Sequence, residues 1–295
     1  MLVSRHPILL IASALAGAVA SGAARAQADA TFDSAGVPIH YVEAGQGEPV
    51  ILLHGYTDDL RSTWVETGVL PALARRYRVI ALDARGHGGS GKPHDRAAYG
   101  PEMGMDIVRL MDHLGIRRAH VVGYSMGGHV VAQLLTRHPE RFATATLGGS
   151  SGRRNWSAGD QRRVDTESNE MDEGVLRSQI LRLWPRDQPP PDEAALRAMS
   201  EQQMAGKDMH ALAAVRRSNP DQVVTEAEMQ AVTVPTLGIV GSNDPYLRDF
   251  QQLKAVMPQL QLVVVDGASH GQTPGRPEFV AALDAFLAAH AGQAG

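Results

Sequence analysis

The stretch His120-Val121-Val122-Gly123-Tyr124-Ser125-Met126-Gly127-Gly128 decides the fold, because it joins a short apolar run to a helix-like run through one serine. Its centre follows the pattern Gly-x-Ser-x-Gly. Small residues on both sides of the serine permit a strained turn from a strand into a helix, and such a turn exposes the hydroxyl oxygen. Free N–H groups at the start of the helix can stabilise a negative charge there. The pattern therefore indicates that Ser125 is a nucleophile.

Two further residues fit the chemistry that such a serine needs. Asp244 follows a predicted strand at residues 236–240, and His270 follows another at residues 262–265. The carboxyl ends of neighbouring parallel strands share one edge of a sheet, where ligands bind. Histidine can take the proton of the serine hydroxyl, and aspartate can hold the imidazole in the useful tautomer. We therefore expect Ser125, Asp244 and His270 to act together.

Two other acids compete with Asp244 for this role. Asp249 falls inside the helix expected after the loop, and Asp266 lies in the loop that carries His270 and is expected to cap it. The position of Asp244 on a loop directly after a strand makes it the better candidate.

Short β-branched runs alternate with helix-length patterns, which is typical of a mainly parallel sheet covered by helices on both faces. The alternation stops between residues 150 and 232, a strand-poor block rich in Arg, Glu, Gln, Ala and Met. We predict that this block is a helical cap between two parts of a core, residues 27–149 and 233–295. The predicted strands are 37–42, 50–53, 78–82, 120–124, 143–147, 236–240 and 262–265, and the predicted core helices are 64–75, 101–114, 126–137, 250–256 and 277–290.

Two more motifs follow the earlier predicted strands. His54-Gly55-Tyr56 comes after the strand at 50–53, and Asp83-Ala84-Arg85-Gly86-His87-Gly88-Gly89-Ser90 comes after the strand at 78–82. The His-Gly pair allows the backbone N–H of Tyr56 to point into the site beside the N–H of Met126, so the two are candidate oxyanion donors. The histidines of both motifs are expected to organise loops rather than to transfer protons.

These five elements resemble the α/β-hydrolase fold superfamily, in particular its cap-bearing members with HG, D-x-R-G-x-G-x-S and G-x-S-M-G-G motifs. The resemblance covers residues 31–290, and the order Ser, Asp, His is the one that hydrolases with the Gly-x-Ser-x-Gly motif require. It implies the α/β class, with the helical cap inserted after the sixth strand. It also implies a carboxylesterase-like serine hydrolase that cleaves a small to medium ester through an acyl-enzyme on Ser125.

Other activities occur on this scaffold. Relatives that hydrolyse epoxides or remove halogens carry an aspartate at the nucleophile position, so Ser125 disfavours both reactions. Relatives that keep serine include lactonases, perhydrolases and hydrolases of carbon–carbon bonds in diketone-like acids. The carboxylate of such an acid needs a cationic partner, which Arg153, Arg154 or Arg177 could provide. A binding protein without catalysis is the alternative of another class, and the complete set of motifs disfavours it.

Apolar residues of the predicted cap are candidates for shaping the substrate pocket. Leu176, Ile180 and Leu183 have a helical spacing that gives one apolar stripe. Lids of this kind exclude solvent and limit substrate size. We name Trp156, Leu183 and Trp184 as the candidate substrate-binding residues.

Neither a cofactor nor a metal is expected. Residues 86–91 match Gly-x-Gly-x-x-Gly, but Lys92-Pro93-His94 continues as loop where a dinucleotide site requires a helix. The sequence has no cysteine, no His-Glu-x-x-His and no EF-hand pattern. These features disfavour zinc and calcium sites.

The first 26 residues have the layout of a secretory signal peptide, with a basic start, an apolar run at 8–20 and Ala24-Arg25-Ala26. The mature protein is expected to begin near Gln27 and to be periplasmic or secreted. The apolar run is shorter than the roughly 20 residues that span a bilayer, so stable membrane insertion is not expected. Cleavage removes Arg5 and Arg25 and no acid, which changes the net charge from −4 to −6. This negative charge disfavours nucleic acid as a partner. The expected partner is a small-molecule ester.

Overall fold

The computed structural model describes residues 28–295, so the predicted signal peptide lies outside the described residues. The described chain forms an eight-stranded sheet in the order β1-β2-β4-β3-β5-β6-β7-β8. Strands β1 and β2 pair antiparallel, as do β2 and β4, and all the other neighbours are parallel. The strands are β1 (Ala28–Ser34), β2 (Val37–Ala44), β3 (Pro49–Leu53), β4 (Arg78–Leu82), β5 (Ala119–Tyr124), β6 (Phe142–Gly148), β7 (Thr236–Gly241) and β8 (Gln261–Val265).

The sheet confirms the predicted α/β class and all seven predicted strands, and it adds β1, which the sequence analysis missed. Strand β1 is an edge strand with alternating exposed and buried residues, paired along its whole length with β2. Its sequence, Ala-Asp-Ala-Thr-Phe-Asp-Ser, is too polar to be recognised as a strand by its hydrophobic pattern.

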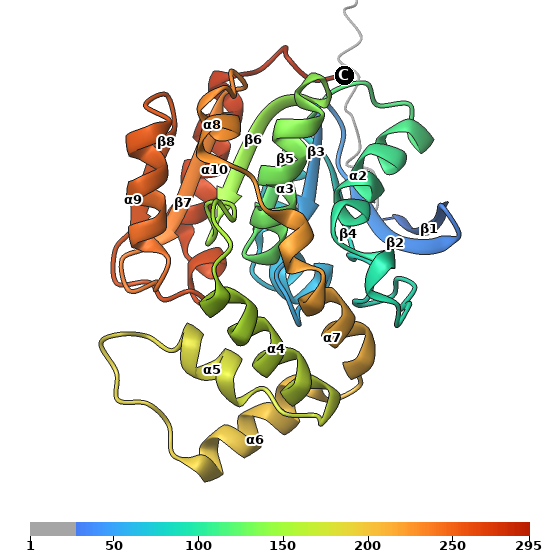
Figure 1. Cartoon of the computed structure of the whole chain (residues 1–295). Helices are drawn as coiled ribbons and strands as arrows, with labels where there is room; N and C mark the ends of the chain where they lie inside the picture. Colours follow the sequence, from blue (N-terminus) through green and yellow to red (C-terminus); the bar gives the residue numbers. More distant parts are fainter. Residues whose placement is uncertain (1–27) are drawn as a thin grey trace, which may run out of the picture.

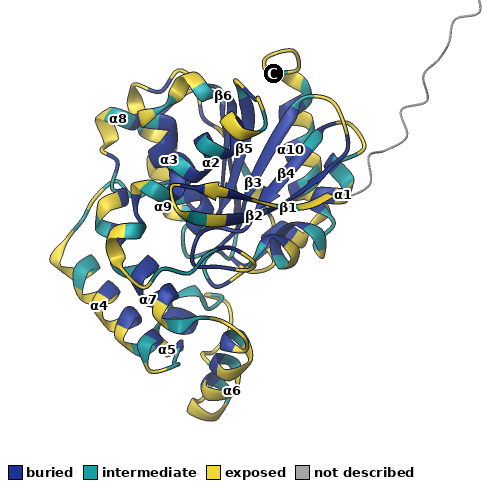
Figure 2. Ribbon diagram, turned by 90° about the vertical axis from the view of Figure 1, so that its right-hand side faces the viewer, coloured by how far each residue is buried: buried dark blue, intermediate teal, exposed yellow. Residues whose placement is uncertain are grey.

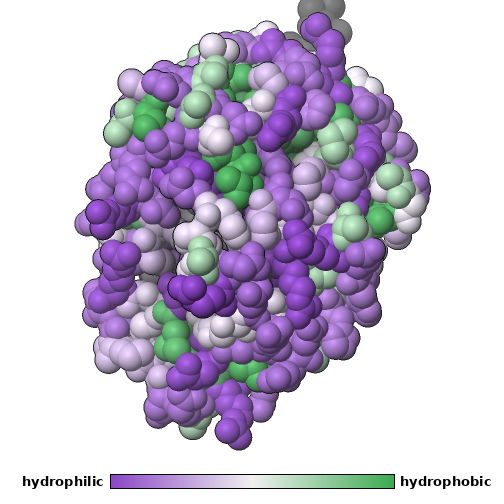
Figure 3. Space-filling view, in the orientation of Figure 1, coloured by the Kyte–Doolittle hydropathy of each residue, from purple (hydrophilic) through white to green (hydrophobic). Residues whose placement is uncertain are grey.

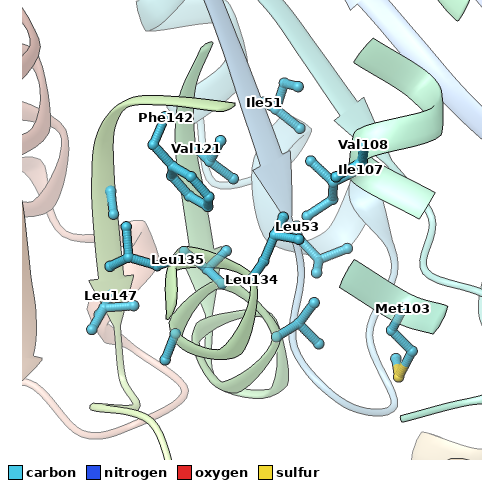
Figure 4. Close-up of a cluster of buried hydrophobic side chains, with 14 of the residues drawn as sticks. Ile51, Leu53, Met103, Ile107, Val108, Val121, Leu134, Leu135, Phe142 and Leu147 are labelled. Carbon is cyan, nitrogen blue, oxygen red and sulfur yellow. The ribbon is translucent and has the colours of Figure 1, made fainter. Parts of the chain in front are cut away.

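Alternate residues of the central strands build two separate cores. In β3, Ile51 and Leu53 face the helices α2 (Pro101–His113) and α3 (Met126–Arg137), while Val50 and Leu52 face the opposite layer. That opposite layer contains α1 (Val69–Leu73) and α10 (Pro277–Ala289). The first core is drawn in Figure 4, and Figure 2 shows the buried strands between the two helical layers. Because both faces are covered, the inner parallel strands β3, β5, β6 and β7 are buried along their whole length and are mainly apolar.

One predicted helix, at residues 64–75, is wrong as a continuous element. The chain instead forms a single π-helical turn at Arg61–Val65, then the short α1. Gly68 separates the two with a φ of 83°, a left-handed conformation that a continuing helix cannot contain. The other predicted core helices are present, including α9 (Leu247–Val256) between β7 and β8.

Five α-helices and one 3₁₀ turn (Asn219–Gln222) lie between β6 and β7 in the chain, and four of the α-helices extend beyond the sheet (Figure 1). We call these four the helical insertion: α4 (Ala158–Asp172), α5 (Arg177–Leu183), α6 (Glu193–Met204) and α7 (Met209–Arg217). The insertion has a small core of its own, which includes Met171, Leu176, Leu196 and Leu212. The fifth helix, α8 (Glu226–Gln230), packs on α3 and α9 instead, and its Met229 belongs to a core of the sheet.

The face of the molecule drawn in Figure 3 is mostly hydrophilic, with small and separate hydrophobic patches. None of the helices in residues 28–295 combines the length and the apolar composition that are needed to cross a membrane.

Candidate active site

The turn at Ser125 has the strained geometry that its sequence predicts. Ser125 ends β5 and precedes α3 with φ 53° and ψ −110°, a conformation that non-glycine residues rarely adopt. A Cβ atom on Gly123 would lie 2.1 Å from the carbonyl oxygen of Gly127, and one on Gly127 would lie 2.2 Å from the carbonyl oxygen of Leu53. The two glycines therefore allow the backbone to close tightly around the serine.

The structure brings Ser125, His270 and Asp244 together. Nε2 of His270 lies 2.9 Å from Oγ of Ser125, and Nδ1 of His270 lies 2.8 Å from Oδ2 of Asp244. The side chains come from the loops after β5, β8 and β7, which meet at one edge of the sheet. His270 is 5% exposed and Asp244 is 2% exposed. This arrangement can move a proton from the serine hydroxyl to an imidazole whose other nitrogen is held by a carboxylate.

The competing acids lie elsewhere. Asp249 is on α9, and Asp266 is exposed, with its carboxylate 3.4 Å from the Ser242 hydroxyl. The second carboxylate oxygen of Asp244 accepts a hydrogen bond from the backbone N–H of Tyr246 at 2.9 Å. Of the three acids, Asp244 is the one that contacts His270.

Two backbone N–H groups beside Ser125 have no protein partner within the described residues, those of Tyr56 and Met126. Met126 is the first residue of α3, so its N–H has no intrahelical acceptor. The loop that carries Tyr56 passes close to the serine, because a Cβ on Gly55 would lie 3.4 Å from Cβ of Ser125. The two groups are thus available to an oxygen atom bound next to Ser125.

Polar contacts made by His54 and Asp83 fix the loop that carries Tyr56 and the loop next to it. Nδ1 of His54 donates to the carbonyl oxygen of Gly55 at 2.7 Å, and Nε2 accepts from the N–H of Ala84 at 3.0 Å. His54 thereby ties two loops together. Asp83 accepts from the N–H groups of Leu60 and Gly89. A Cβ on Gly88 would lie 2.2 Å from the Asp83 carboxylate, which explains this glycine without a nucleotide.

The helical insertion also contacts the loop that carries Tyr56. The hydroxyl of Tyr56 donates to the carbonyl oxygen of Leu212 at 2.7 Å, and the guanidinium of Arg216 lies 4.1 Å from the centre of the Tyr56 ring. Arg216 and Arg182 share the buried carboxylate of Glu167, at 3.0 and 2.6 Å. Three of the four inserted helices are thus linked by one ion-pair network beside the site.

A cavity of about 440 Å³ lies between the sheet edge and the insertion, and Ser125 and His270 are on its wall. Its volume is within the usual range for small-molecule sites. The predicted pocket residues Leu183 and Trp184 line it, as does Ile180. Leu176 points instead into the core of the insertion.

The prediction that Trp156 lines the substrate pocket is wrong. Trp156 lies outside the cavity wall, and its ring nitrogen donates to the side chain of Gln161 at 3.1 Å. It precedes α4, and its ring lies 5.4 Å from the guanidinium of Arg153, so it contacts a residue of the cavity wall without lining the cavity.

The sequence analysis missed several polar residues of the cavity wall, among them Asp58, His129, Arg182 and Arg216. Burial raises the pKa of the Asp58 carboxyl, and burial followed by the charge of Arg153 holds the pKa of His129 well below its ordinary value. The position of His129 one turn after Ser125 is a signal that could have found it. Within residues 28–295, no three acidic or histidine side chains gather in a way that could hold a metal ion.

Comparison with known proteins places these features in a family. Residues 48–272 match the family model described as alpha/beta hydrolase fold. A protein of Caulobacter sp. (strain K31) named "Putative carbamate hydrolase RutD" is 30% identical over 236 residues, which is 75% of this chain and 85% of that protein. The enol-lactonase from Burkholderia xenovorans LB400 superposes with a TM-score of 0.71 at 24% identity, covering 88% of this chain and all of that one.

A third similarity is local. The dihydrolipoyllysine-residue acetyltransferase component of the acetoin cleaving system of Pseudomonas putida is 42% identical over 106 residues. The match covers 36% of this chain and 28% of the relative, so this chain spans less than a third of that protein.

Proposed function

Because the chain belongs to the α/β-hydrolase fold family, we propose that it is a serine hydrolase that cleaves small to medium carboxylic esters through an acyl-enzyme on Ser125. The observation that carries the proposal is the hydrogen-bonded series Ser125, His270 and Asp244 on the wall of a cavity. These contacts support the roles of nucleophile, base and acid in acyl transfer.

In the first half of the reaction, Nε2 of His270 accepts the proton of Ser125 as Oγ attacks the ester carbonyl carbon. The carbonyl oxygen becomes an oxyanion, which the N–H groups of Tyr56 and Met126 stabilise. The protonated His270 then gives its proton to the leaving alcohol, and the acyl group stays on Ser125.

In the second half, His270 takes a proton from water, and the resulting hydroxide attacks the acyl carbon. Collapse of the second tetrahedral intermediate returns the proton to Ser125 and releases the acid. Asp244 keeps the imidazole in the tautomer with the proton on Nδ1 and stabilises the imidazolium that forms in both halves. No step requires a cofactor.

The helical insertion supports the preference for small to medium esters. In this proposal it acts as a cap, and its Leu183 and Trp184 line the cavity that contains Ser125. A cavity of about 440 Å³ accommodates a compact ester and excludes the full length of a long-chain triglyceride.

A panel of esters with increasing acyl length, beside a panel of diketo acids, tests the proposal. We expect turnover of short and medium esters and none by Ser125→Ala. Cleavage of the diketo acids alone would favour the carbon–carbon bond hydrolase, and preferred cleavage of cyclic esters would favour the lactonase. Perhydrolysis with added peroxide identifies the perhydrolase. Absence of every reaction in folded protein would contradict catalysis and favour a binding protein.

We also propose that the protein is exported and loses residues 1–26, on the basis of the signal-peptide pattern of its sequence. Intact-mass measurement of protein recovered from the periplasm or medium should give an N-terminus at or near Gln27. Exported protein that retains Met1 would contradict cleavage.

A further inference from the structure

The guanidinium of Arg153 lies on the wall of the catalytic cavity without a carboxylate partner. Its polar contact is a distant one, 3.5 Å from Nη1 to the carbonyl oxygen of Asn219, and its other neighbour is the ring of Trp156, with the centroid at 5.4 Å. Within residues 28–295, no acidic side chain lies within ion-pair distance of it.

Each of the other arginines of the cavity wall has a carboxylate partner. Arg182 and Arg216 share Glu167, and Arg163 pairs with Asp160 at 2.7 Å. Arg153 is the exception among these four, although burying an unpaired charge is unfavourable. Burial, followed by the charge of Arg216, lowers the pKa of Arg153 to about 9, so the group is still charged at neutral pH.

The backbone fixes the position of Arg153. Its carbonyl oxygen accepts a hydrogen bond from the N–H of Val224 at 2.8 Å, within a parallel bridge to Val223. The side chain of Arg153 therefore starts from a backbone that hydrogen bonding fixes in place. Its guanidinium reaches the cavity that contains Ser125. A fixed and uncompensated guanidinium in a substrate cavity is suited to an anionic group of the substrate, since it can donate two parallel hydrogen bonds to a carboxylate.

The charges around the cavity also favour the binding of an anionic group near Arg153. The half-buried His129, one turn after Ser125, lies within the field of Arg153, Arg182 and Arg216. Asp58 also lines the cavity, and its carboxylate is 3.1 Å from the position of a Cβ on Gly55. The positive charges of the three arginines attract an anionic group of the substrate into the part of the cavity that Arg153 lines.

We infer that Arg153 anchors an anion-binding subsite and that the preferred esters carry a free carboxylate in addition to the scissile ester. This inference rests on the proposed function and adds the chemical class of its substrate. Of the three arginines that the sequence offered, Arg154 donates to Ser151 and to the backbone of Asp249, and Arg177 pairs with Glu193 at 2.7 Å. Arg153 is the one that reaches the cavity.

Two matched pairs of esters test the inference. Monoethyl adipate against ethyl hexanoate places the carboxylate in the acyl part, and 4-carboxyphenyl butyrate against 4-carbamoylphenyl butyrate places it in the alcohol part. We expect kcat/KM to favour the charged ester in one pair by about tenfold or more, mainly through KM. Arg153→Gln should remove that preference, Arg153→Lys should keep part of it, and Arg154→Gln should keep all of it.

A binding measurement separates this inference from the proposed function. In Ser125→Ala protein, calorimetry with monoethyl adipate should detect binding that Arg153→Gln weakens about tenfold, whether or not turnover is observed. Equal kcat/KM within both ester pairs would overturn the inference and leave an ester hydrolase. A preference that survives Arg153→Gln would overturn it as well.

Discussion

The sheet and the helical insertion meet at one cavity, but they are built in different ways. The strands before Ser125 and Asp244 are fully buried, the strand before His270 is a partly exposed edge strand, and close backbone approaches fix the turns after β5 and β7. The insertion consists of four helices of 7 to 15 residues around a small core, joined by ion pairs. The candidate catalytic groups thus lie on the part with the larger buried core. In the proposed function, the helical insertion contacts the rest of the substrate.

The largest expected effect is on the sheet side. Ser125→Ala and His270→Ala should each lower kcat by about 10⁴-fold or more, and the double variant should lose little beyond either single one, because the two groups act as a unit. Steady-state kinetics with a short ester measures this. If the losses in kcat multiplied in the double variant, Ser125 and His270 would not act as a unit.

Asp244→Asn should lower kcat by about 10³-fold, because an amide favours the wrong tautomer of His270 while it preserves the shape of the site. Asp266→Asn is the matched control, an acid in the loop that carries His270 whose exposed carboxylate does not contact the imidazole. Thermal unfolding should show that both variants fold. If Asp266→Asn lowered kcat and Asp244→Asn did not, the catalytic acid would be Asp266 and not Asp244.

On the insertion side, Glu167→Gln should destabilise the protein by about 2 kcal/mol at pH 7, because it leaves Arg182 and Arg216 without their shared carboxylate. Burial raises the pKa of Glu167, but Arg216 and Arg182 outweigh it, so the pKa in the folded state lies below its ordinary value. The carboxylate therefore stabilises the fold above the ordinary pKa of glutamate, and this stabilisation is lost as the pH falls through the folded-state pKa.

Denaturant unfolding at several pH values checks this prediction. The difference between the unmodified protein and Glu167→Gln should be largest at neutral pH and should shrink below about pH 4. Glu193→Gln, which removes an exposed ion pair with Arg177, is the control and should change stability little. A difference that grows on acidification would show that the network does not act as described.

The smallest expected effect is on selectivity. Leu183→Ala or Trp184→Ala enlarges the cavity and should shift the preferred acyl length by a few carbons, with a change of about tenfold in relative kcat/KM. Long-chain triglycerides as the best substrates of the unmodified protein would contradict this role of the insertion.

The same contrast explains what the sequence could predict. Motifs after strands identified the serine, the acid and the histidine, because strand order and loop position bring such residues to one edge whatever the details of packing. The missed β1 and the helix broken at Gly68 depend on edge pairing and on one backbone angle. Trp156 and the network around Glu167 depend on how short helices pack against one another, and no local pattern records that.

The central claim is that the sheet edge carries the chemistry and the insertion does not. Reaction with a fluorophosphonate probe, followed by mass spectrometry of the peptides, tests it most directly. The account predicts a single modified residue, Ser125, with no labelling of Ser125→Ala and undiminished final labelling of Leu183→Ala. Modification of another residue, or none in folded and unmodified protein, would contradict it.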